Sequence, residues 1–294
     1  MPPRELLIEY CEDEFTDYLV YQKLAQRENQ TERRQLLLAL SRQEQEHYEF
    51  WRDVLDGHVP RPRRLVLHFI VALRYLFGLT FAIKFLERHE KQVIEEYRRV
   101  RPLFEGQAGA RLERMIADEE QHENFFIGQI NESVVKYLGF IVLGLADAII
   151  EITGVHAGFL GVTSSTTMAG VAGLIVGFAA AISMATAAYL QAKQGSERNP
   201  LVSALLTGFS YLLAVVFLAL PYFLTARMLL AFLVSLGMAM LLTAYFTFYS
   251  AVLFDRHFGR EFVESTLLTF GTAIATYFFG EFLGRVFGLP HYAS

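Results

Sequence analysis

Hydrophobic and polar positions divide the chain into two parts with different patterns. From Met1 to Lys136, apolar residues recur every three to four positions among charged ones, which is the spacing of helices with one buried face. This spacing predicts four helices, at about 4–28, 32–55, 64–101 and 108–136. No segment alternates with the period of a strand, so residues 1–136 are predicted to form a four-helix bundle.

After Tyr137 the pattern changes to long apolar runs that are separated by short polar segments. A helix needs roughly 20 apolar residues to cross a hydrocarbon core of about 30 Å. Five runs are near this length, at about 138–160, 169–190, 201–224, 228–254 and 267–287. The chain is therefore predicted to be all-α, with a bundle at residues 1–136 and a five-span transmembrane domain at residues 137–294.

The distribution of charge agrees with this division. The chain has 26 Lys and Arg and 31 Asp and Glu residues, and only 13 of these 57 follow Lys136. The apolar segment 65–86 contains His68, Arg74 and Lys84, and charges at mid-depth in a bilayer are costly. We therefore predict an amphipathic helix there, whose apolar face meets the other helices, a second subunit or the membrane surface.

Composition also excludes several classes of protein. A single cysteine, Cys11, excludes an intramolecular disulfide framework and a cysteine-rich metal site. The net charge of -5 and the absence of a basic block argue against nucleic acid as a partner. The acidic N-terminus has no apolar signal segment, so the N-terminal domain is expected to stay in the cytoplasm. The cell's inner membrane is then the expected location, and the positive-inside rule agrees through Lys193, Arg198, Arg256 and Arg260 on the inner side.

Two Glu-x-x-His motifs carry the main chemical signal of the N-terminal domain. They are Glu44 with His47 and Glu119 with His122, and each pair lies on one helical face. Glu14 and Glu90 precede them, and corresponding residues of the two halves are 75 or 76 positions apart. One Glu from each of two helices and Glu-x-x-His from each of the other two is the ligand set of a dinuclear carboxylate centre.

This donor set favours iron, as Fe(II) and Fe(III), or manganese over calcium. The alternative is that these residues are solvated surface charges. Tyr21 and Tyr97 follow the two single Glu ligands by seven residues. They are predicted either to hydrogen-bond the ligand carboxylates or to be aromatic residues of the core.

Ionisable residues inside the predicted spans are the second chemical signal. Asp147 and Glu151 lie four residues apart in the first span, and two carboxylates repel each other unless a proton or a cation intervenes. They predict a cation pathway, and Met184 in the second span could add a thioether ligand. The alternatives are a polar contact between helices for the carboxylates and packing for Met184.

Two other polar residues and the glycines of these spans give weaker signals. Glu281 in the last span is either a further candidate for the pathway or the partner of Arg285, four residues later. His156 is expected near the end of the first span, facing a loop or serving the pathway. Small residues in the first two spans predict a closely packed hairpin that could lie at a dimer interface; they are Gly139, Gly144, Gly154, Gly158, Gly161, Gly170, Gly173 and Gly177.

These motifs resemble two known families. Residues 1–136 resemble the rubrerythrin branch of the ferritin-like superfamily, through Glu14, Glu44, His47, Glu90, Glu119 and His122. Residues 137–294 resemble the vacuolar iron transporter family, through GLADAIIE in the first span and AISMATAAYLQAKQGSE in the second. The fused arrangement is similar to the membrane-bound ferritin proteins of bacteria and archaea, which are implicated in iron export.

The resemblance implies a homodimer in which Asp147 and Met184 contribute to the translocation site, with Glu151 nearby. Two features depart from the transporter family. Plant-type members have a Glu-rich helical domain between the second and third spans, whereas this connection is only about residues 191–200. The family also often has an acidic residue before the aromatic residue of the second span, where this chain has Ala188 before Tyr189.

The first hypothesis is a homodimeric exporter of Fe(II) or Mn(II) that is driven by proton exchange and that captures or oxidises the metal in its di-iron bundle. No nucleotide-binding motif is present, which argues against ATP as the energy source. The alternative is a membrane-anchored di-iron oxidoreductase, a ferroxidase or peroxidase whose spans are an anchor or a quinone contact. A third hypothesis is an iron sensor whose bundle gates the pore.

Overall fold

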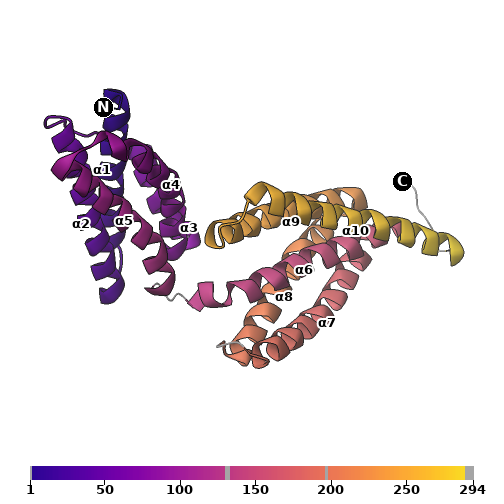
Figure 1. Ribbon diagram of the computed structural model, residues 1–294. Helices are drawn as coiled ribbons and strands as arrows, with labels where there is room; N and C mark the ends of the chain where they lie inside the picture. The colour runs from indigo at the N-terminus through magenta and orange to yellow at the C-terminus, as the bar shows by residue number, and fades with distance from the viewer. Residues whose placement is uncertain (1, 130–132, 196–197, 289–294) are drawn as a thin grey trace. The chain divides into compact units, whose positions relative to one another are not determined.

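The computed structural model describes the chain except residues 1, 130–132, 196–197 and 289–294, and it describes no side chains for residues 89–91 and 121–136. All regular secondary structure in the described ranges is helical, as predicted, and none of it is strand (Figure 1). The chain divides into two compact units, Met1–Glu132 and Ser133–Ser294. The predicted boundary after residue 136 lies four residues beyond this division.

The described residues of the first unit form five α-helices and one short 3-10 helix. They are α1 (Arg4–Gln26), α2 (Thr31–Val54), α3 (Arg64–Phe77), α4 (Leu79–Val100), η1 (Arg101–Leu103) and α5 (Gly106–Gln129). Helix α1 packs against α2 and α3, and α5 packs against α2 and α4. An aromatic core joins α1, α2 and α4, since the ring centroids of Tyr10 and Tyr97 are 5.0 Å apart and those of Trp51 and Tyr97 are 5.2 Å apart.

The predicted third helix is interrupted, so the expectation of one continuous helix at 64–101 was wrong. Helix α3 ends at Phe77 and α4 begins at Leu79, because Gly78 adopts a φ of 92°. Only glycine takes up this conformation readily, since it has no Cβ. The predicted end of the segment, before Pro102, agrees with the end of α4 at Val100.

In the described part of the second unit, five helices are long and apolar enough to cross a membrane, which fits an integral membrane protein. They are α6 (Ser133–Val162), α7 (Thr166–Lys193), α8 (Pro200–Leu224), α9 (Met228–Leu253) and α10 (Phe258–Val286). No other helix among the described residues is long and apolar enough to be a span, and α3, with 14 residues, is too short to be one.

The last helix begins earlier than predicted. It starts at Phe258 rather than near residue 267, because its charged first turns remain helical. Arg260 and Glu264, one turn apart, form an ion pair of 2.9 Å, and such pairs stabilise an exposed helix.

Small residues allow close approach between the helices of the second unit, as predicted, but not only within the first hairpin. A Cβ added to Gly144 of α6 would lie 2.8 Å from the backbone oxygen of Thr207 on α8. One added to Gly154 of α6 would lie 2.9 Å from Thr272 on α10. Gly173 of α7 faces the imidazole of His156 on α6. The glycines of α6 therefore serve contacts with α8 and α10, and the close approach of α6 and α7 depends on Gly173 of α7.

Gly173→Ala is expected to destabilise the second unit, because the new Cβ would overlap the buried ring of His156. Overpacking of this kind costs about 1–3 kcal/mol. Circular dichroism melts of the purified chain in detergent measure it, because the only tryptophan, Trp51, lies in the other unit. Gly237→Ala on α9, where a Cβ would meet nothing within 4 Å, is the matched control and should not lower the melting temperature. Equal melting temperatures for both variants would contradict the packing described here.

Candidate metal centre and polar residues of the membrane helices

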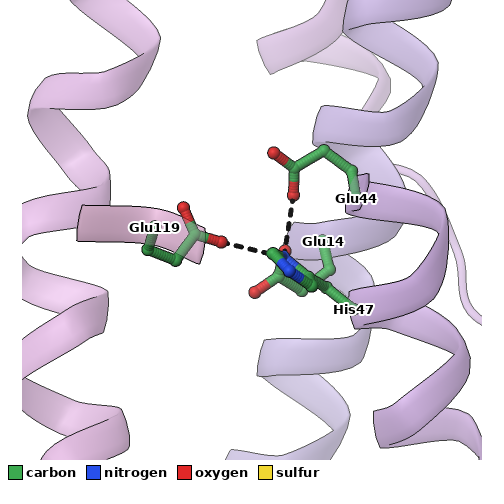
Figure 2. A group of neighbouring side chains, drawn as sticks. All are labelled: Glu14, Glu44, His47 and Glu119. Carbon is green, nitrogen blue, oxygen red and sulfur yellow. Dashed lines mark ion pairs between the residues drawn. The ribbon is translucent and has the colours of Figure 1, made fainter. Parts of the chain in front are cut away.

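Three helices of the first unit bring together a buried group of potential metal ligands. Glu14 comes from α1, Glu44 and His47 come from α2, and Glu119 comes from α5 (Figure 2). One ligand atom from each residue lies within 4.8 Å of the others. All four side chains are buried, with exposed fractions of 4% or less. This group, called the four-residue cluster below, could hold a metal ion.

His47 lies at the centre of the cluster. Its Nδ1 atom is 2.9 Å from Glu119 Oε1, 3.4 Å from Glu44 Oε2 and 3.6 Å from Glu14 Oε2. Carboxylate oxygens and an imidazole nitrogen suit divalent ions such as iron and manganese. Three carboxylates this close together in a buried site also repel one another unless a proton or a cation lies between them. The donor set therefore fits a metal ion both chemically and electrostatically.

The surroundings of Glu44 and His47 shift the pKa values of both side chains. Burial, and then the charge of Glu119, raise the pKa of Glu44 well above its usual value. Burial alone would lower the pKa of His47, but its hydrogen bonds to the surrounding carboxylates outweigh burial and raise that pKa. Nearby on α1, burial and the charge of Glu14 raise the pKa of Asp17, and burial raises that of Asp13 to about 6. The metal-free site therefore retains protons that a bound cation would displace.

The metal-free first unit is expected to lose stability as the pH rises from 5 to 8. Groups whose pKa is raised on folding bind more protons in the folded state than in the unfolded state. Their contribution to the free energy of unfolding is complete below the unfolded pKa, which is about 4 for carboxyl groups and about 6.5 for histidine. It disappears as the pH rises above the folded pKa. A fall in melting temperature on the order of 5 °C is expected. Trp51 fluorescence of the chelated chain measures it, because this only tryptophan lies in the first unit.

Saturating Mn(II) is the control for this pH experiment. It should stabilise the first unit most at pH 8, where fewer protons compete for the ligands. A melting temperature of the chelated chain that stays constant or rises between pH 5 and 8 would contradict the proton uptake described here.

Tyr97 connects the cluster to the aromatic core. Its hydroxyl donates a hydrogen bond to Glu14, and Trp51 Nε1 donates one to the same hydroxyl over 3.0 Å. The hydrogen bond to Glu14 and the place of the ring in the aromatic core correspond to the two roles predicted for Tyr97, and ligation by Glu14 stays a prediction. Tyr21 on α1 is fully buried as well, and its predicted role stays a prediction.

Tyr97→Phe is expected to weaken metal binding by roughly 10- to 100-fold, as loss of an outer partner of a metal ligand does. The ring still fills the core, while Glu14 loses the donor that orients it. Competition titration with a chromophoric chelator measures the affinity for Mn(II). Tyr75→Phe is the matched control, since Tyr75 is exposed and its hydroxyl accepts a hydrogen bond from the surface residue Arg27. Equal affinities for the two variants would contradict the role given to Tyr97.

The sequence did not reveal Asp118 and Trp51 as neighbours of the cluster. Asp118 Oδ2 is 3.8 Å from His47 Nε2, on the ring side away from the three glutamates. A carboxylate at the second nitrogen of a ligating histidine fixes the orientation of the ring. The only signal in the sequence was the acidic run around Glu119, and acidic runs are usually solvated.

A polar cavity of about 240 Å³ lies against His47. Its lining includes Glu46, Glu49, Arg114 and Asp118 from α2 and α5. It is large enough for a hydrated ion to reach the ring. The cluster is therefore buried but has a polar approach from the α2–α5 side.

The second half of the predicted ligand set lies outside the described side chains. Glu90 belongs to α4 and His122 to α5, but neither side chain is described. Their ligation, and with it the dinuclear form of the centre, stays a prediction.

In the second unit, Asp147 and Glu151 lie one turn apart on α6, and both are partly buried. Tyr211 of α8 donates a hydrogen bond from its hydroxyl to Glu151. Met184 of α7 packs against an apolar cluster that includes Ala148 and Tyr211. Within the described residues, no group of three or more His, Cys, Asp or Glu side chains converges here. The predicted pathway residues therefore remain candidates.

The two weaker predictions for the membrane helices have different outcomes. Glu281 pairs with Arg285, which is the second of its two predicted roles. His156 does not face a loop, because α6 continues to Val162 and Gly173 leaves room for the imidazole. The ring is fully buried, and its centroid is 4.0 Å from that of Tyr222 on α8.

Comparisons with protein-family models, with curated proteins and with solved structures give no match to this chain. The family resemblances therefore rest on the motifs alone.

Proposed function

We propose that this chain is a membrane transporter that exports Fe(II) or Mn(II) from the cytoplasm and captures or oxidises the metal in its first unit. One observation carries the proposal. A chain with five helices that can span a membrane also contains a buried cluster of three glutamates and a histidine. A membrane anchor needs no carboxylate pair, yet Asp147 and Glu151 lie within the first of these helices.

In this proposal the four-residue cluster is the capture site. Glu14, Glu44, His47 and Glu119 hold the ion, and Glu90 and His122 complete a dinuclear, ferritin-like centre. Tyr97 orients Glu14, and Asp118 orients the imidazole of His47. Bound iron would supply one-electron redox chemistry between Fe(II) and Fe(III). Protons held by Glu44 and His47 leave as the cation binds.

Asp147, Glu151 and Met184 form the proposed translocation pathway. Intramembrane carboxylates can exchange protons for a divalent cation, which would couple export to proton entry. Tyr211 holds Glu151 in one orientation by its hydrogen bond. The first unit is proposed to lie in the cytoplasm, the spans in the inner membrane, and the transporter to be a homodimer.

Flux into proteoliposomes tests the proposal. With an acidic lumen, Fe(II) or Mn(II) added outside should enter, and a lumenal metal-sensitive dye reports the rate. A protonophore should abolish the dependence on the pH gradient, and Ca(II) should not be transported. The absence of iron and manganese flux from the wild-type chain would overturn the proposal.

The polar cavity beside His47 favours a second candidate, a membrane-anchored ferroxidase or peroxidase. A cavity of about 240 Å³ also accommodates dioxygen or hydrogen peroxide. This candidate predicts that Glu44→Ala abolishes peroxide consumption, whereas Asp147→Ala changes neither peroxide consumption nor iron sensitivity of the cells.

A further inference from the structure

Helix α3 has an exposed apolar face along its whole length. Its Leu67, Ile70 and Leu73 are buried against the first unit. On the opposite side, Leu65, Phe69, Tyr75 and Leu76 have exposed fractions of 88%, 50%, 71% and 68%. Leu65, Phe69, Ala72 and Leu76 follow one another at intervals of three or four residues, so they form one stripe. Exposed apolar surface of this kind marks an interaction site.

The helix is held with this stripe outward. Phe69 contacts Phe85 of α4 edge to face, with ring centroids 5.7 Å apart. At the other end, Arg74 Nη2 donates a hydrogen bond of 2.7 Å to the backbone oxygen of Arg27. The turn at Gly78 ends α3 before α4 begins. The stripe therefore cannot turn inward without breaking contacts on both sides of the helix.

The charges of α3 indicate what the stripe meets. The helix contains Arg64 and Arg74 and no acidic residue, and Arg61 and Arg64 are exposed at its start. Arg74 is paired with Glu28, so the uncompensated charge lies at the N-terminal end. A short helix with leucine and aromatic residues on one face and arginine beside them is typical of helices that lie in a membrane interface. Anionic head groups attract the arginines.

We propose that the stripe of Leu65, Phe69, Ala72 and Leu76 lies in the interfacial layer of the membrane that holds the five spans, with Arg61 and Arg64 among anionic head groups. A lipid surface is favoured over a second copy of the chain because the bilayer is attached through the same polypeptide. Its effective concentration is therefore high, and one short helix suffices. The inference is independent of metal transport, since it rests only on α3 and on the presence of the spans.

Site-directed spin labelling of the full chain in nanodiscs with anionic lipid tests this. The only native cysteine, Cys11, is fully buried, so a new surface cysteine can be labelled selectively. A nitroxide at Ala72→Cys should be several-fold more accessible to dissolved oxygen, relative to a water-soluble nickel complex, than nitroxides at Ala39→Cys and Ala110→Cys. These are exposed alanines of α2 and α5. Equal ratios at the three positions would overturn the proposal.

Two further measurements test whether lipid covers the stripe. Strong spin–spin broadening between Ala72 labels of two copies would show that protein, not lipid, covers the stripe, and would also overturn the proposal. Leu65→Asp combined with Leu76→Asp should return the Ala72 label to the ratio of the controls. Leu103→Asp, at a leucine of η1 that is 52% exposed, should leave it unchanged. A lipid-like ratio at Ala72 that survives the double substitution would count against the stripe.

Discussion

Asp147→Asn should reduce metal flux by more than roughly 10- to 100-fold, which is the cost of losing an outer partner of a metal ligand. The expected loss is larger because Asp147 is a direct ligand in the proposed pathway. Asparagine keeps the size of the side chain but removes the charge that attracts a divalent cation and the group that exchanges a proton. Asp147→Glu retains the carboxylate and should retain part of the flux. The measurement is the initial rate of Fe(II) or Mn(II) entry into proteoliposomes with an acidic lumen.

The same membrane domain offers a matched control for this substitution. Glu281 also lies within a candidate span, but it is paired with Arg285 on the same helix. Glu281→Gln should therefore keep a rate close to that of the wild type. If Asp147→Asn and Glu281→Gln have the same rate as the wild-type chain, the carboxylate of Asp147 has no part in transport and the proposed pathway is wrong.

Glu44→Gln should abolish tight metal binding in the first unit and, at the same time, stabilise the metal-free chain at pH 8. Glutamine removes one of the four potential ligands, and it also removes a buried carboxylate that repels Glu14 and Glu119. A functional site that costs stability has this opposite pair of effects. The measurements are Mn(II) content by mass spectrometry after gel filtration and the Trp51 fluorescence melt of the chelated chain.

Glu32→Gln is the control, because Glu32 is exposed at the start of the same helix and does not line the cavity beside His47. It should change neither the metal content nor the melt. If Glu44→Gln retains the wild-type metal content, the four-residue cluster is not the binding site. If Glu44→Gln destabilises the chelated chain at pH 8, repulsion among the three carboxylates does not lower the stability of the metal-free protein.

Much of the site followed from spacing. Glu44 and His47 are three residues apart, so they share a face of any helix that contains them. The near-constant offset between the two halves of the repeat related Glu14 to Glu90 and Glu44 to Glu119. The five spans followed from run length, because the thickness of a bilayer sets a lower limit on helix length.

What escaped prediction depends on how one helix packs on another. The contact of Asp118 with His47 requires the relative register of α2 and α5, which no local pattern encodes. His156 is buried because α7 has no side chain at Gly173. Gly78 illustrates a local ambiguity, since a glycine inside a helical pattern costs only about 1 kcal/mol and does not by itself predict a break.

Anomalous scattering at the iron edge, from crystals of the full chain soaked anaerobically in Fe(II), tests the central claim most directly. The claim is that one chain binds the same metal in both of its units. The predicted result is one anomalous peak within ligand distance of Glu14, Glu44, His47 and Glu119 and another within ligand distance of Asp147. Crystals of Asp147→Asn should lose the second peak and keep the first. A wild-type map without a peak at the four-residue cluster, or with a peak there and none beside Asp147, would contradict the account.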